Sequence, residues 1–197
     1  MADEKKRNEK EKHLYPLFKN WLFTQGFGRV KDTSATKNRD LGTWGNPDIT
    51  GLKIHETLGK TTDIEIATIE VKTTLKDWKM WIFEAVAHKR FSNRTYFAFA
   101  HSEELLNKIE PDLKHYAELY GIGILILPIS KDLAEKFNSD KKMTTNIDIE
   151  DDYTSTDIIE YASAHYQRTN YHFRSRFLTA ISITTESLLH SWGDNIE

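Results

Sequence analysis

The chain has 197 residues, 39% of them hydrophobic and 12% aromatic, with a formal net charge of −3 at pH 7 and no cysteine. This length fits one ordinary domain, and the composition favours a packed core over a disordered chain. Without cysteine there is no disulfide, thiol nucleophile or zinc–thiolate site. The net charge gives no general attraction to nucleic acid, so any such binding must come from a local basic surface.

Hydropathy along the chain argues against a membrane protein. No apolar run approaches the roughly 20 residues that a membrane-spanning helix needs. The first residues, MADEKKRNEKEKH, lack the apolar centre of a secretory signal. We therefore expect a cytoplasmic protein with no membrane partner.

The first part of the chain predicts a helix, a long loop and a pair of strands. Apolar residues recur at helical spacing, and Gly26 is a plausible end of the helix. These apolar residues are Leu14, Leu17, Phe18, Trp21 and Leu22. Residues 28–46 are polar, basic and glycine-containing, which is typical of a long loop. Residues 48–56 and 63–72 then have strand character, with Leu58, Gly59 and Lys60 in the turn between them.

Helices and strands alternate in the next part of the chain. The predicted elements are a helix over 77–90, a buried strand over 95–101, helical structure over 103–120 with a break at Pro111, a strand over 122–128 and a short helix over 130–138. The order helix, strand, strand, helix, strand, helix, strand predicts an α/β fold with a mixed central sheet flanked by helices.

The sequence divides into three segments. Residues 1–140 hold the predicted core, and residues 141–156 are polar and partly acidic, which predicts a linker or long loop. Residues 157–192 have the pattern of two helices. We therefore expect residues 157–197 to form a C-terminal helical appendage packed on the core.

The most informative residues are Pro47-Asp48 and Glu70-Val71-Lys72. Side chains alternate along a strand, so Glu70 and Lys72 point to one face, and a charged pair in an apolar strand is costly without partners. If the hairpin folds symmetrically about Gly59, Asp48 faces Glu70, because each lies eleven residues from that glycine. A bulge would shift this register.

Two facing carboxylates repel each other, and a nearby lysine only partly offsets the repulsion. A divalent cation bound by Asp48 and Glu70 would satisfy both, and Mg²⁺ commonly uses one or two carboxylates together with substrate phosphates. Such a metal activates water and stabilises charge on a phosphodiester. Lys72 could orient the water, deprotonate it or neutralise the phosphate.

This pattern resembles the PD-(D/E)xK nuclease superfamily, which has the restriction-endonuclease-like fold. Pro47-Asp48 is followed by 21 residues and then Glu70-Val71-Lys72, and the element order over residues 11–128 is similar to the family core. The resemblance implies an endonuclease that uses Mg²⁺, with Mn²⁺ expected to substitute. By matching position, Asp48 and Glu70 would be metal ligands, the Val71 carbonyl an additional ligand and Lys72 the catalytic lysine.

Two further acids enter through the resemblance. Many members carry a glutamate on the first helix, and Glu11 stands at the matching place. Many also carry a glutamine on the helix after the lysine strand. Here Glu84 stands at about that place, which departs from the pattern, so its role is open: a further acid of the site or a solvated residue.

Basic and aromatic residues predict a nucleic-acid surface. Arginine and lysine contact phosphates, and aromatic rings stack on bases. The predicted contacts are Lys37, Arg39, Trp44, Lys76, Lys79, Lys89, Arg90, Arg174 and Arg176. We expect DNA as the partner, although the residues do not distinguish DNA from RNA, and a homodimer would present two sites to two strands.

Simpler interpretations compete with this hypothesis. Asp48 could be a turn residue and Glu70–Lys72 an exposed salt bridge of little energetic value. The chain could also be an inactive nucleic-acid-binding module on the same fold, or a protein-interaction subunit that docks through its C-terminal helices. The eight histidines show no zinc-binding HExxH pattern and are expected to be surface or packing residues.

Overall fold

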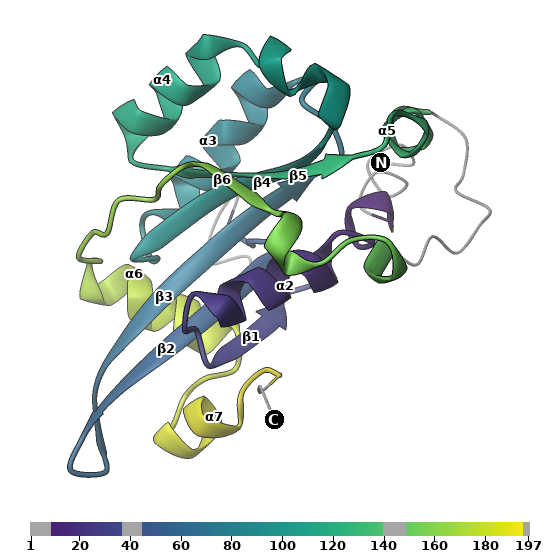
Figure 1. Cartoon of the computed structure of the whole chain (residues 1–197). Helices are drawn as coiled ribbons and strands as arrows, with labels where there is room; N and C mark the ends of the chain where they lie inside the picture. The colour runs from purple at the N-terminus through teal and green to yellow at the C-terminus, as the bar shows by residue number, and fades with distance from the viewer. Residues whose placement is uncertain (1–8, 37–44, 140–148, 195–197) are drawn as a thin grey trace.

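A six-stranded mixed sheet forms the centre of the computed structural model, which describes residues 9–36, 45–139 and 149–194 (Figure 1). The strands lie side by side in chain order. Strands β1 to β3 are antiparallel, β3 to β5 are parallel, and β6 is antiparallel to β5. The strands are β1 (Arg29–Asp32), β2 (Ile49–Thr57), β3 (Lys60–Lys72), β4 (Arg94–Ser102), β5 (Gly123–Ile129) and β6 (Ile159–Ala162). The α/β class and the mixed sheet are therefore as predicted.

The described helices lie where the apolar spacing predicts them in the first two thirds of the chain. The α-helices are α2 (Tyr15–Thr24), α3 (Trp78–His88), α4 (Pro111–Tyr120), α5 (Lys131–Asn138), α6 (Tyr171–Ala180) and α7 (Glu186–Ser191), and the 3₁₀ helices are η2 (Glu103–Lys108), η3 (Ile149–Asp151) and η4 (Ser155–Asp157). Pro111 begins α4 as expected, since the first turn of a helix does not use that N–H. Gly121 ends α4 with φ of +63°, in the left-handed region that glycine tolerates.

Near the predicted site, the strands of the hairpin pair in the expected register. Two deviations that compensate for each other produce this register, and the sequence did not show them. Thr57 pairs with Lys60 across a two-residue turn, so the turn is centred between Leu58 and Gly59. A register shift between His55 and Glu56 then compensates for this half-residue offset. Ile49 consequently pairs with Ile69, and Asp48 lies one position before this pair, beside Glu70.

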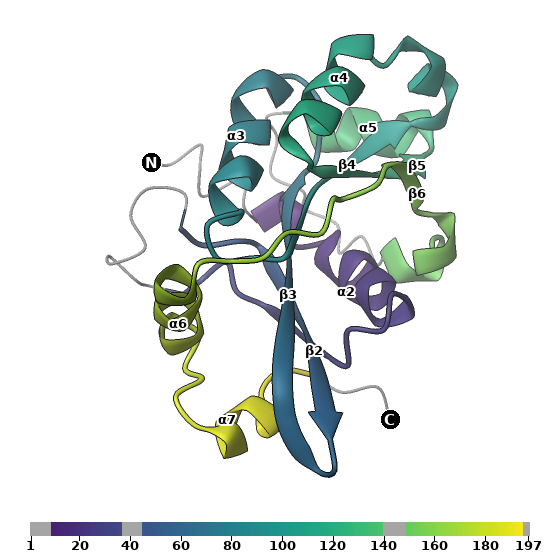
Figure 2. The ribbon, with the colours of Figure 1, turned by 90° about the vertical axis from the view of Figure 1, so that its left-hand side faces the viewer.

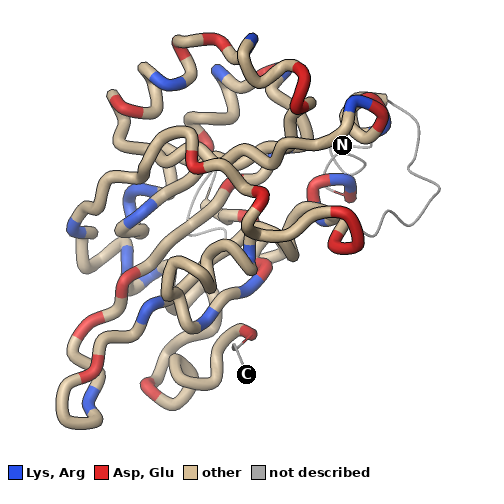
Figure 3. Tube along the Cα trace, in the orientation of Figure 1, with Lys and Arg blue, Asp and Glu red and all other residues tan. Residues whose placement is uncertain are grey.

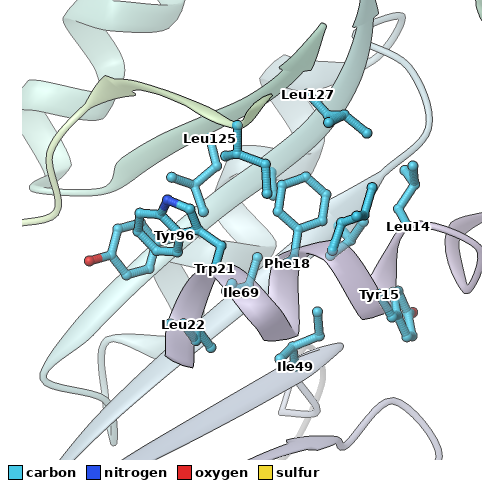
Figure 4. Close-up of a cluster of buried hydrophobic side chains, with 14 of the residues drawn as sticks. Leu14, Tyr15, Phe18, Trp21, Leu22, Ile49, Ile69, Tyr96, Leu125 and Leu127 are labelled. Carbon is cyan, nitrogen blue, oxygen red and sulfur yellow. The ribbon is translucent and has the colours of Figure 1, made fainter. Parts of the chain in front are cut away.

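Helices cover both faces of the sheet. On one face, α2 and α5 pack against alternate residues of β3, β4 and β5. Figure 4 shows Phe18 and Trp21 of α2 among side chains from these strands. On the other face, α3 and α4 pack on β4 and β5. Glu70 and Lys72 are out of phase with Ile69 and Val71, which belong to the α2 core, so they face α3.

The C-terminal segment departs from the prediction of two helices over residues 157–192. Residues 159–162 form β6 at the edge of the sheet, and α6 and α7 follow. The two helices pack on the hairpin through a separate apolar cluster, in which Phe177 stacks on Phe91 with ring centroids 4.0 Å apart. Helix α6 lies on the same side of the sheet as α3, opposite α2 (Figure 2). The boundaries at residues 140 and 157 stay a prediction.

The predicted loop over residues 28–46 also contains a strand. Residues 29–32 form β1, which pairs with β2 on one side, while Val30 bridges Asp194 on the other. These four residues include two basic side chains and one acid, so they carry no apolar signal for a strand. Among the described helices, none is long and apolar enough to cross a membrane.

Candidate active site

A buried polar cluster lies where β3 ends and β2 begins. Glu11, Asp48, Glu70 and Lys72 are each at most 8% exposed. Strand β3 is therefore buried at Glu70 and Lys72, whereas the simpler interpretation of these two residues required an exposed salt bridge. Burying charged groups at this density is unfavourable unless they neutralise one another or bind an ion.

Lys72 is the cation at the centre of this cluster. Its Nζ lies 2.5 Å from Glu70 Oε1, 3.1 Å from Glu84 Oε2 and 3.9 Å from Glu11 Oε1. Burial by itself would lower the pKa of Lys72, but Glu70, Glu11 and then the other carboxylates outweigh it and raise this pKa above its ordinary value. Lys72 is thus a positively charged hydrogen-bond donor at neutral pH.

Asp48 is held through both of its oxygens. The hydroxyl of Tyr15 donates to Oδ1 at 2.5 Å, and the backbone N–H of Val71 donates to Oδ2 at 2.8 Å. Tyr15 comes from the first turn of α2, and Val71 lies between Glu70 and Lys72 on β3. Each carboxylate oxygen can accept more than one bond, so these contacts fix Asp48 and leave it able to bind a cation.

The pKa values of both predicted metal ligands are raised above their ordinary values. Burial raises the pKa of Asp48, although Lys72, Tyr15 and Val71 work in the opposite direction. Burial and then the charge of Asp48 raise the pKa of Glu70 well above its usual value, and Glu84 adds to the effect. The cluster has four carboxylates for one ammonium, so its negative charge is incompletely balanced.

The structure brings two further acids to the cluster: Glu11, which the resemblance implied, and Glu84, which stands where many family members carry a glutamine. Glu11 lies just before α2 and reaches Lys72 from the side of that helix. Glu84 extends from α3 toward the same ammonium and lies close enough to Glu70 to raise the pKa of that carboxyl. Glu84 is therefore part of the cluster and not a solvated residue.

His88 is the residue of this cluster that sequence reasoning missed. It is fully buried, and its Nε2 lies 3.9 Å from Glu70 Oε2, beyond hydrogen-bond distance. Burial, helped by Arg90 and Lys72, lowers its pKa to about 3, so the ring is neutral and makes no ion pair. The sequence signal that could have identified His88 is its spacing of seven residues from buried Trp81, which places both residues on one face of the helix.

Most of the predicted nucleic-acid contacts that the structure describes are engaged by the protein itself. Lys79 pairs with Glu110 at 3.4 Å, Lys89 donates to the Gly121 carbonyl at 3.4 Å, and Arg90 donates to the Ala87 carbonyl at 2.8 Å. Arg174 pairs with Asp63 at 3.0 Å.

The structure gives only the exposure of two further predicted contacts, and three others lie outside the described residues. Lys76 is exposed and Arg176 is half-buried. Lys37, Arg39 and Trp44 lie outside the described residues. Basic and acidic residues both occur throughout the described trace (Figure 3).

The donor set of the cluster fits a hard divalent cation. The groups at hand are carboxylate oxygens with excess negative charge, and Mg²⁺ and Mn²⁺ prefer oxygen ligands. Among the described residues, no three His, Asp or Glu side chains are already placed to hold a metal ion. The Val71 carbonyl stays a predicted ligand.

Comparison with known proteins assigns no relative to this chain: no family model, curated protein or solved structure matches it.

Proposed function

We propose that this chain is a metal-dependent endonuclease that hydrolyses DNA phosphodiester bonds on a restriction-endonuclease-like core of the PD-(D/E)xK superfamily. The observation that carries the proposal is the buried ammonium of Lys72 among Glu70, Glu84 and Glu11, beside Asp48. Three of these five residues are the Asp, Glu and Lys of the sequence motif. We assign the metal to Asp48 and Glu70.

A bound Mg²⁺ or Mn²⁺ would supply an activated water and stabilise charge on the phosphate. Lys72 donates hydrogen bonds from Nζ to the attacking water or to a phosphate oxygen, and its positive charge offsets the charge that develops there. The raised pKa argues against Lys72 as the base that deprotonates the water. Tyr15 and the Val71 N–H keep Asp48 in one orientation.

The decisive experiment is cleavage of plasmid and single-stranded DNA with Mg²⁺ or Mn²⁺. We expect Glu70→Ala and Lys72→Ala to lose at least about 100-fold in rate, as expected for removal of groups that stabilise a transition state. Glu104→Gln removes an exposed acid from η2 and serves as the matched control. Circular dichroism and thermal unfolding check that each variant is folded.

Cleavage that survives in both folded variants would contradict the assignment of the site. No cleavage and no Mn²⁺ binding by the wild type would instead support an inactive nucleic-acid-binding or protein-interaction module. The same proposal includes DNA as the partner, a homodimer and a cytoplasmic location.

A further inference from the structure

An unexplained feature of the candidate site is the imidazole of His88. Neither ring nitrogen has a hydrogen-bond partner among the described residues, although the side chain is fully buried. A buried polar group without a partner destabilises the fold, because no hydrogen bond compensates for the loss of its hydration. The helix position could hold an apolar residue at no such cost, because Trp81 and Ala85 on the same face are packed in the core.

The surroundings of the ring point to one function. His88 follows Trp81 and Glu84 along the face of α3 that looks onto β3, and its Nε2 is 3.9 Å from Glu70 Oε2. The other oxygen of Glu70 is held by Lys72 at 2.5 Å. Lys72 therefore holds one oxygen of Glu70, while the Nε2 of His88 stands about 1 Å farther from the other oxygen than an ordinary hydrogen bond would place it.

We infer that His88 is a positioning residue for Glu70: its Nε2–H donates to Glu70 Oε2 when Glu70 binds a divalent cation. This inference rests on the proposed function, because it needs Glu70 as a ligand. A carboxylate that turns from Lys72 toward a cation must move its second oxygen, and a shift of about 1 Å toward His88 completes a hydrogen bond of ordinary length. Donors in the layer behind a metal ligand fix its orientation and typically change metal affinity 10–100-fold.

The amide side chains offer a matched test. The Nε2 of glutamine falls near the position of histidine Nε2, whereas the Nδ2 of asparagine falls near histidine Nδ1. His88→Gln keeps a donor toward Glu70, and His88→Asn keeps the amide but moves it away. Mn²⁺ binding to the full chain is measured without DNA from the electron paramagnetic resonance signal of free Mn²⁺, with Glu70→Ala as the reference for loss of the ligand.

We expect the Mn²⁺ dissociation constant to rise about 10-fold or more in His88→Asn and to stay within about threefold of wild type in His88→Gln. Equal affinity in wild type and both variants would overturn the inference, since a histidine that only fills space changes the melting temperature and not metal affinity. A wild type that binds no Mn²⁺ would overturn the proposed function itself, and with it the inference.

A measurement on the unaltered protein keeps the inference testable if a variant does not fold. Long-range ¹H–¹⁵N correlation spectra report the imidazole nitrogens directly. On addition of Mg²⁺, the Nε2 of His88 should carry the proton and its resonance should shift, with slower exchange of that proton with water. An unchanged His88 resonance at a Mg²⁺ concentration that saturates the site would overturn the inference.

Discussion

The hydroxyl of Tyr15 donates a 2.5 Å hydrogen bond to Oδ1 of Asp48, which joins the first turn of α2 to the start of β2. Both groups are buried. The bond fixes the carboxylate that we propose as a metal ligand. Helix α2 therefore contributes Tyr15 to the site, and Glu11 joins the site from just before this helix.

Tyr15→Phe should weaken Mn²⁺ binding and slow cleavage about 10-fold, because Asp48 loses the donor that orients Oδ1. Titration calorimetry and DNA cleavage measure the two effects. Tyr153→Phe is the matched control, since its hydroxyl accepts a bond from Ser130 N–H at 2.9 Å outside the cluster. Wild-type affinity in Tyr15→Phe would show that Asp48 needs no such support.

Glu84→Gln should extend metal binding to lower pH. Glu70 has a raised pKa from burial and from Asp48, and Glu84 raises it further. Removing the Glu84 charge lowers the pKa of Glu70, so the carboxylate stays ionised and able to bind metal in more acidic buffer. The acid limb of the Mn²⁺ affinity profile should move down by about 0.5–1 pH unit. Glu110→Gln is the control, and an unchanged or upward-shifted limb would contradict the prediction.

His88 should make the protein sensitive to acid. Its pKa is lowered to about 3 in the folded state, mainly by burial, against an ordinary value of 6.5. Between these values the unfolded chain binds the extra proton, so the free energy of unfolding falls as pH drops, by up to about 1.4 kcal/mol per pH unit from this group.

This acid sensitivity is measured as a difference between two proteins. Urea unfolding of wild type and His88→Gln in EDTA should show the stability of wild type declining relative to the variant from pH 7 to pH 5. His172→Gln, which removes an exposed histidine of α6, is the control. A difference that is constant with pH would refute the prediction.

Leu58→Asn should stabilise the hairpin. Leu58 has φ of +53° and is 98% exposed, and Gly59 also has positive φ. Two-residue turns of this kind favour Asn-Gly, so asparagine should raise the free energy of unfolding by about 0.5–1 kcal/mol. Leu58→Ala keeps the strained φ and should give no such gain in urea unfolding. Equal stability of the two variants would count against the turn assignment.

The sequence by itself determined the α/β class, most strands and helices, and the residues of the acidic pair with its lysine. Periodicity carries this information where an element buries one face, as in α2, and a continuous apolar run carries it where a strand is buried on both faces, as in β4. The symmetric register was also predictable, although it depended on two deviations, at the turn and between His55 and Glu56, that compensate for each other.

Only the tertiary structure decided which residues surround Lys72 and which elements complete the sheet. Strands β1 and β6 are short and partly exposed, so backbone pairing with neighbouring strands, and not an apolar pattern, defines them. Glu84 and His88 join the site because α3 crosses β3 at that level. Burial and contacts between distant segments set the protonation and partners of these groups, and one sequence carries no local signal for either.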